Sequence, residues 1–220
     1  MEVRQVRPHL WHWTAPHPDW TPKDGGPNGW EREVGSYALV ERDELVLFDP
    51  LAPEDGTDDA ERFWRALDRD VESHGAPRVL VTVYWHARSS HAIADRYPET
   101  RVWAHEPAAA ELGKRTTVTD TFVARDSLPG GVEPLETTRA GEVLFWVPRH
   151  GAVVAGDVLL GTADGRVRRC PDSWLSGRTT PAEVDEELRA LLDLPVEALL
   201  VTHGAPVLDG ARAALDRALG

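Results

Sequence analysis

Four apolar runs of the sequence each end in a side chain that can bind a metal or move a proton. These residues are Asp49, His86, Asp157 and His203. In α/β folds, ligands bind at the carboxyl ends of strands. A single Asp or His after a strand is more often a turn former or a cap. Four of them together indicate one shared site.

Two carboxylates and two imidazoles at one site would support two kinds of chemistry. A catalytic zinc ion needs three protein ligands and an open position for water, and its charge lowers the pKa of that water. Without a metal, Asp157 and His203 remain candidates for general acid/base catalysis. The sequence has no Gly-x-Ser-x-Gly elbow and no phosphate-binding loop, so serine-hydrolase and nucleotide-dependent functions lose support.

The elements that must position these residues form an α/β pattern. Ser36–Val40 and Leu45–Phe48 flank a polar turn, and Asp58–His74 has the apolar spacing of an amphipathic helix. Thr180 has the sequence context of a capped helix start. Further strands are expected at Val79–Val83, Arg101–Ala104, Val118–Val123, Val132–Leu135, Val143–Val147, Ala152–Ala155 and Ala198–Val201, and further helices at Ser90–Tyr97, Pro107–Arg115 and Leu208–Leu219. This order favours helices covering both outer faces of the strand layers.

Composition and charge narrow the function classes. The 220 residues include 24 Lys+Arg and 37 Asp+Glu, a formal net charge of −13, which disfavours nucleic-acid and anionic-membrane partners. The length suits one domain over Met1–Gly220. No apolar run approaches the roughly 20 residues of a membrane-spanning helix, the start lacks a signal-peptide core, and Cys170 is the single cysteine. We therefore expect a cytoplasmic protein that binds a small-molecule ligand or substrate.

The 9 tryptophans are unusually many for this length. Trp85 precedes His86, and others cluster near the N-terminus at Trp11, Trp13, Trp20 and Trp30. An aromatic site mouth would suit an apolar or aromatic ligand. Core packing and loop anchoring are the simpler interpretation, and we prefer it for most of these residues. Tryptophan-rich loops could also bury a homodimer contact.

Five segments resemble the metallo-β-lactamase-fold hydrolases in order and spacing, over nearly the full chain. They are VLFDP (Val46–Pro50), LVTVYWHARSSHAIADRY (Leu80–Tyr97), ETTRAGEVLFW (Glu136–Trp146), AVVAGDVLLG (Ala152–Gly161) and LLVTHGAPVL (Leu199–Leu208). The resemblance implies a four-layer αβ/βα sandwich with a metal site at one edge, between the two sheets. In that family, histidine and aspartate side chains hold one or two zinc or iron ions.

The ligand set of this chain departs from the family pattern. Matching residue types remain only at His86, Asp157 and His203, with Asp49 at a position that supports the site. Other residue types replace family ligands at Tyr84, Arg88 and Thr138. A guanidinium is always charged, so Arg88 would oppose metal binding. It could pair with Asp157 or Asp49 and partly substitute for a missing cation.

The resemblance implies two function hypotheses. The first is a hydrolase-like protein with most metal ligands replaced and no dinuclear zinc site, which keeps the pocket and binds a small molecule. The second is an active hydrolase of an ester, thioester, lactone or amide, with a single ion held by His86, Asp157 and His203. The expected cofactor is either none or one weakly held zinc or iron ion, and catalytic competence stays open.

Overall fold

The N-terminal half of the chain forms one sheet and the helices that cover it. The computed structural model describes residues 1–139, 141–162, 164–175, 177 and 179–220. The strands lie across the sheet in chain order: β1 (Val3–Arg7), β2 (Leu10–Pro16), β3 (Glu33–Glu41), β4 (Glu44–Phe48), β5 (Arg78–Leu80), β6 (Arg101–His105) and β7 (Asp120–Phe122). The strands β4 to β7 run parallel to one another. The helices are α1 (Asp58–His74), α2 (Ser90–Arg96) and α3 (Ala109–Leu112).

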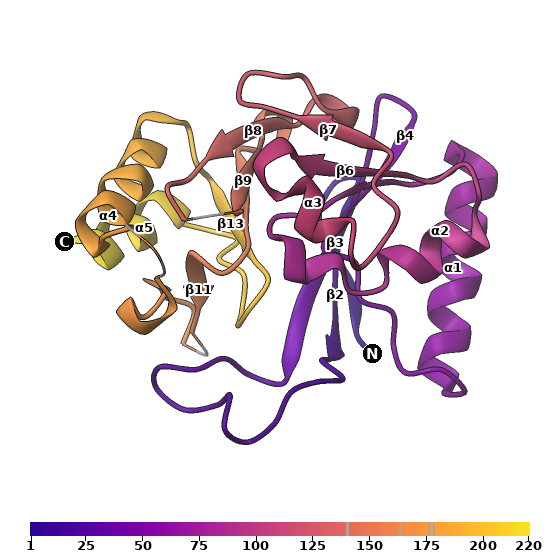
Figure 1. The fold of residues 1–220 in the computed structure, drawn as a ribbon, viewed down its shortest axis with the longest axis horizontal. Helices are drawn as coiled ribbons and strands as arrows, with labels where there is room; N and C mark the ends of the chain where they lie inside the picture. Colours follow the sequence, from indigo (N-terminus) through magenta and orange to yellow (C-terminus); the bar gives the residue numbers. More distant parts are fainter. Residues whose placement is uncertain (140, 163, 176, 178) are drawn as a thin grey trace.

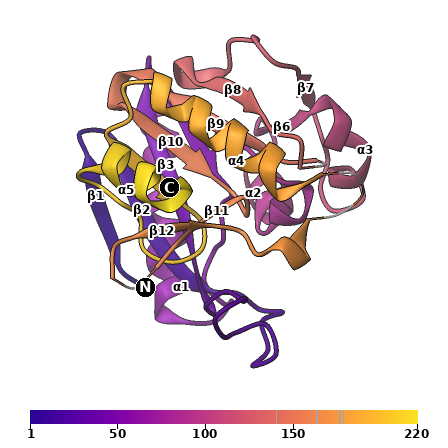
Figure 2. The same cartoon turned by 90° about the vertical axis from the view of Figure 1, so that its left-hand side faces the viewer.

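The C-terminal half forms a second, smaller sheet. Its order is β13-β10-β9-β8, from β8 (Glu133–Glu136), β9 (Val143–Val147), β10 (Ala152–Ala155) and β13 (Ala198–Val201). The edge strand β13 runs parallel to β10. A short antiparallel hairpin joins β11 (Leu159–Gly161) to β12 (Val167–Arg169). The helices α4 (Pro181–Ala190) and α5 (Ala211–Leu219) lie in front of the sheet in Figure 2.

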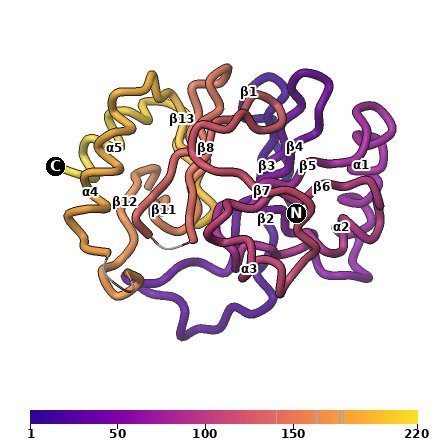
Figure 3. Tube along the Cα trace, turned by 45° about the horizontal axis from the view of Figure 1, so that its top comes forward, coloured from indigo at the N-terminus to yellow at the C-terminus, as the bar shows by residue number. Residues whose placement is uncertain are grey.

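The two sheets pack face to face between two groups of helices. Figure 1 shows α4 and α5 at one end of the molecule and α1 and α2 at the other, and Figure 3 shows the two halves of the chain side by side. Separate buried clusters fill the space between the sheets and the space under each helix layer. This arrangement confirms the four-layer αβ/βα sandwich expected from the sequence. Within the described ranges, no helix is both long enough and apolar enough to cross a membrane.

Local signals in the sequence set the ends of the longest helix. The side chain of Thr57 accepts the N–H of Ala60 and caps the start of α1. Gly75 ends α1 with a φ of 81°, a backbone conformation that favours glycine. Phe63 and Leu67 are buried on the face of α1 that meets the sheet. The helix predicted over Asp58–His74 is confirmed with these bounds.

Several predicted elements are shorter in the structure. The strand expected over Val118–Val123 spans only Asp120–Phe122, and the helix expected over Leu208–Leu219 begins at Ala211. The strand expected over Val79–Val83 ends at Leu80, because the N–H of Thr82 donates to the side chain of Asp49 and not to a neighbouring strand. The helix expected over Pro107–Arg115 is reduced to α3 and a preceding 3₁₀ turn. The early end of β5 thus depends on a contact between segments distant in sequence, which local patterns do not report.

Tyr37 on β3 ties the two sheets together through a buried hydrogen bond. Its hydroxyl donates to the carbonyl of Val201 on β13 at 2.6 Å, and the side chain is fully buried. Tyr37→Phe keeps the ring but leaves that carbonyl without this donor, so we expect the free energy of unfolding to fall by about 1–2 kcal/mol. Urea denaturation followed by circular dichroism measures the change. Tyr97→Phe, at a partly exposed hydroxyl, is the control, and an equal loss in both variants would contradict the prediction.

Candidate functional site

The structure brings four of the sequence-predicted residues to one edge of the sandwich. Asp49 follows β4, and His86 lies in a 3₁₀ helix, Tyr84–Ala87, after β5. Asp157 and His203 follow β10 and β13. Because β4 runs parallel to β5 and β10 runs parallel to β13, the ends of each pair point the same way. The site therefore joins the strand ends of both sheets.

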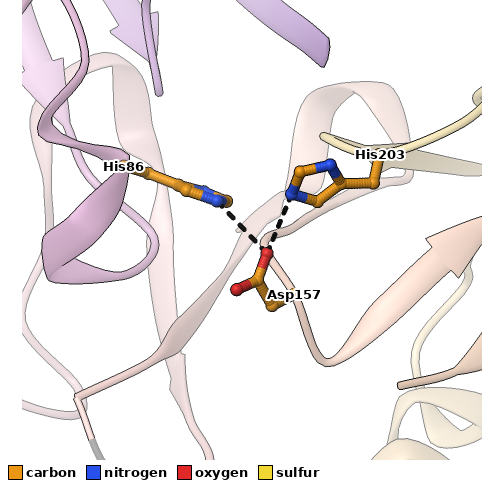
Figure 4. Close-up of side chains that lie close together, drawn as sticks. All are labelled: His86, Asp157 and His203. Atoms are coloured by element: carbon orange, nitrogen blue, oxygen red, sulfur yellow. Dashed lines mark ion pairs between the residues drawn. The ribbon is translucent and has the colours of Figure 1, made fainter. Parts of the chain in front are cut away.

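The carboxylate of Asp157 lies between the imidazoles of His86 and His203 (Figure 4). Its Oδ1 atom is 3.2 Å from Nε2 of His86 and 3.0 Å from Nε2 of His203. One ligand atom from each of the three residues fits within a span of 4.8 Å. Oδ1 of Asp157 and Nδ1 of His203 are buried, yet no described residue forms a hydrogen bond with either atom. Oδ1 of Asp157 and the Nε2 atoms of the two histidines therefore converge near one point, and Oδ1 has no hydrogen-bond donor among the described residues.

Asp49 fixes the orientation and the proton position of His86. Its Oδ2 atom is 2.9 Å from Nδ1 of His86, while Oδ1 accepts the N–H of Thr82 at 2.8 Å. The Thr82 hydroxyl also donates to Oδ2. A carboxylate has no proton to donate, so Nδ1 of His86 carries the hydrogen. In the neutral imidazole of His86, Nε2 is then the nitrogen whose lone pair is free for a ligand.

The second oxygen of Asp157 is held by Trp85 and Arg139. The indole N–H of Trp85 donates to Oδ2 at 2.7 Å, and Nη1 of Arg139 lies 3.6 Å from the same atom. Arg139 is buried and also forms an ion pair with the buried carboxylate of Glu142. Arg139, and not Arg88, therefore supplies the guanidinium beside Asp157. No pattern in the sequence marks Arg139, which follows the exposed Thr138 in a turn.

Arg88 lines the site but is bound to the backbone and not to a carboxylate. Its Nη1 atom donates to the carbonyls of Gly35 and Asp49, at 2.8 and 2.9 Å. The Nε and Nη2 atoms are buried and have no acceptor among the described residues. The expected pairing of Arg88 with the carboxylate of Asp157 or Asp49 is therefore wrong, because the strand-end carbonyls take its donors.

Tyr84 and Thr138 lie outside the cluster. Thr138 is exposed, and its N–H donates to Glu187 at 2.6 Å, so the ligand position expected there is not part of the site. Tyr84 packs its ring edge-on against the ring of Trp85, with 4.6 Å between centroids. The turn after β8 directs Arg139 inward in place of Thr138. Ala140, within the third of the five segments singled out in the sequence, lies outside the described residues.

Burial and neighbouring charges shift the pKa values of the cluster in opposite directions. Burial and Arg88 disfavour the charged form of His86, but the carboxylates of Asp157 and Asp49 outweigh them and raise its pKa. Burial lowers the pKa of His203 to about 4, and Asp157 opposes this only in part. Burial alone would raise the pKa of Asp157, but the adjacent imidazoles hold it well below its usual range. At neutral pH the cluster therefore offers a carboxylate and a neutral imidazole at His203, the forms that bind a metal ion.

A cavity of about 870 Å³ lies over the cluster, a size typical of small-molecule sites. Its aromatic lining includes Trp30, Trp64, Trp85 and Trp174. The ring of Trp30 stands edge-on to His203, with 4.8 Å between centroids. Trp13, in contrast, is a packing residue whose indole N–H donates to the carbonyl of Leu51. The tryptophans thus serve both roles considered from the sequence, and Trp64 and Trp174 could not be assigned to the cavity from their positions in the sequence.

Comparison with solved structures finds several metallo-beta-lactamases of similar fold. One from Pontibacter korlensis matches with a TM-score of 0.69 and 14% identity, covering 99% of this chain and 96% of that chain. The mono-zinc form of FIM-1 from Pseudomonas aeruginosa matches with a TM-score of 0.69 and 9% identity, covering 99% and 94%. A metallo-beta-lactamase family protein from Thermus thermophilus matches with a TM-score of 0.63 and 19% identity, covering 97% and 79%.

A scan against protein-family models and a search of curated proteins give no match. The similarity is therefore one of structure, at low sequence identity and over nearly the whole chain. This similarity agrees with the α/β sandwich described above. The chain has the metallo-β-lactamase fold.

Proposed function

We propose that this protein is a hydrolase that uses one divalent metal ion, held by His86, Asp157 and His203. The observation that carries the proposal is the unsatisfied Oδ1 atom of Asp157, which lies between two imidazole Nε2 atoms. Two imidazole nitrogens and one carboxylate oxygen form a common ligand set of catalytic zinc. The large cavity over these atoms leaves room for a substrate. The bond cleaved would belong to an ester, thioester, lactone or amide.

The residues present fit a single ion. Zinc–ligand bonds of about 2.0–2.2 Å place tetrahedral ligand atoms about 3.4 Å apart. Oδ1 of Asp157 lies 3.0 and 3.2 Å from the two Nε2 atoms, and all three ligand atoms lie within 4.8 Å of one another. The carboxylate of Asp49 supplies the hydrogen bond that metal-binding histidines usually make with their other nitrogen. The guanidinium of Arg139 repels a second cation near Oδ2 of Asp157. One of the similar structures, FIM-1, is described in a mono-zinc form.

The residues of the chain divide the work of the site. A bound ion would supply Lewis-acid polarisation of a carbonyl and a lowered pKa for water. Asp49 holds His86 in the tautomer that presents Nε2. Trp85 and Arg139 hold Oδ2 of Asp157, so that Oδ1 faces the two imidazoles. The aromatic cavity wall would limit water around a bound substrate and hold it against the cluster.

Arg139 favours a second candidate function, a metal-free protein that binds a small molecule in the same cavity. Its guanidinium lies 3.6 Å from the carboxylate of Asp157 and offsets that negative charge without an ion. In this alternative, His86 and His203 would bind the ligand through hydrogen bonds. The fold alone does not decide between the two functions.

Elemental analysis and hydrolysis assays test the proposal together. We expect about one equivalent of zinc or iron per chain, and a loss of this metal in His203→Ala, which removes one of three ligands. Hydrolysis of a panel of aryl esters, thioesters, lactones and anilides should stop after chelation and return with zinc. His91→Ala, at an exposed histidine, is the control and should keep both properties. Absence of metal at saturating zinc, with no rise in Tm, would instead support the metal-free function.

A further inference from the structure

Arg88 lines the cavity and carries two buried N–H donors that have no acceptor among the described residues. Its Nη1 atom is fixed by the carbonyls of Gly35 and Asp49, at 2.8 and 2.9 Å. The Nε and Nη2 atoms find no acceptor among the residues the structure describes. These two N–H groups lie along one edge of the guanidinium plane, and that edge binds a carboxylate through two parallel hydrogen bonds. The backbone contacts thus orient the group while leaving its carboxylate-binding edge unused.

The charge of Arg88 also lacks a carboxylate partner within the described chain. Asp49 is engaged through both oxygens with Thr82 and His86. Asp157 is engaged with Trp85 and Arg139 on one oxygen and faces the imidazoles with the other. Burial lowers the pKa of Arg88, the expected effect when a cation is removed from water. An anion delivered by a ligand would compensate this buried charge.

The surroundings of Arg88 define the rest of the ligand. The cavity of about 870 Å³ is lined by Arg88, by the three residues of the cluster and by the rings of Trp30 and Trp85. Indole faces and edges bind flat aromatic or apolar groups. A carboxylate on Arg88 would therefore place an attached aromatic body against the tryptophans and close to the cluster.

We propose that this cavity binds organic carboxylates with an aromatic body, and that Nε and Nη2 of Arg88 receive the carboxylate. In the proposed hydrolase, this carboxylate belongs to the substrate and anchors it beside the scissile bond. Only this assignment to the substrate rests on the proposed function. Binding itself needs neither the metal ion nor hydrolysis. The two proposals can therefore fail independently.

Calorimetric titration of chelator-treated protein with naphthylacetate and with naphthylacetamide tests the ligand class. The amide has the same aromatic body without the charge. We expect the acid to bind about 10- to 100-fold more tightly, the range for a buried charge-assisted pair of hydrogen bonds. Arg88→Gln should remove this preference. Arg88→Lys keeps the charge but loses the planar pair of donors, so it should lose most of the preference as well.

Arg32→Gln is the matched control, because Arg32 also lines the cavity but is exposed. It should keep the preference for the acid. Equal affinity of wild-type protein for acid and amide would overturn the proposal, as would an equal loss of preference in the Arg32 and Arg88 variants. A preference that appears only with added zinc and survives in Arg88→Gln would place the carboxylate on the ion and also overturn it. Thermal unfolding verifies that each variant folds. If Arg88→Gln does not fold, Arg88→Lys replaces it in the comparison with the Arg32 variant.

Discussion

Replacing Arg139 with Met should lower the free energy of unfolding by about 3–5 kcal/mol, the loss typical of a broken buried ion pair. Arg139 and Glu142 are 6% and 1% exposed and form an ion pair. Glu142 also accepts the N–H of Val158 at 2.8 Å, so its carboxylate cannot move to water without losing this buried hydrogen bond. Without the guanidinium, this carboxylate would remain buried with no cation beside it. Urea denaturation at neutral pH measures the loss.

A double variant separates the lost ion pair from the lost side-chain volume. Arg139→Met with Glu142→Gln removes both charges, so it should be clearly more stable than Arg139→Met alone. A double variant as unstable as the single one would show that packing, and not the unpaired charge, causes the loss.

The pH dependence of Arg139→Met has a defined sign. Burial already raises the pKa of Glu142 even though Arg139 opposes this, and loss of Arg139 should raise it further. A carboxyl group with a folded-state pKa above its unfolded value of about 4.3 binds more protons when folded, so its destabilising effect shrinks as pH falls. The stability difference from wild type should therefore be smaller at about pH 5 than at about pH 8. Equal differences at both pH values would contradict the assignment of the effect to Glu142.

The fold and the cluster members could be predicted because their signals are local. An apolar run that contains a strand precedes each of the four cluster residues, Asp49, His86, Asp157 and His203. Parallel pairing of β10 with β13 then necessarily brings the residues after them to one edge. The cap expected at Thr180 likewise acts over a few residues and sets the start of α4.

The partners of these residues could not be predicted, because they come from segments that meet only in three dimensions. Thr138 and Arg139 are neighbours in a turn, and the backbone of that turn decides which of them enters the site. Arg88 is drawn to carbonyls at the ends of β3 and β4, and a pattern of side-chain types contains no information about backbone acceptors. The cavity wall combines Trp64 from α1 with Trp174 from the 3₁₀ helix Asp172–Trp174, far apart in sequence.

Asp49→Asn should weaken zinc binding by about 10- to 100-fold while preserving the fold, the range found when the hydrogen-bond partner of a metal ligand is changed. Asp49 is fully buried, and its carboxylate accepts from Nδ1 of His86 and from Thr82. An amide of the same shape can still accept the Thr82 N–H through its oxygen. Its NH₂ group, however, would face Nδ1 of His86 as a donor. The imidazole would then carry its hydrogen on Nε2, the atom that must be free to bind the ion.

Competition with a chromophoric zinc chelator measures the affinity, and nitrogen chemical shifts of the His86 ring report the tautomer in metal-free protein. Thr82→Val is the control: it removes a hydroxyl that contacts both Asp49 and Nδ1 of His86, but leaves the shorter hydrogen bond between Asp49 and His86 in place. It should lower the free energy of unfolding by about 1 kcal/mol and change zinc affinity little. Unchanged zinc affinity in Asp49→Asn, despite a shifted tautomer, would show that His86 does not bind the ion, since a ligand cannot lose its lone pair without cost.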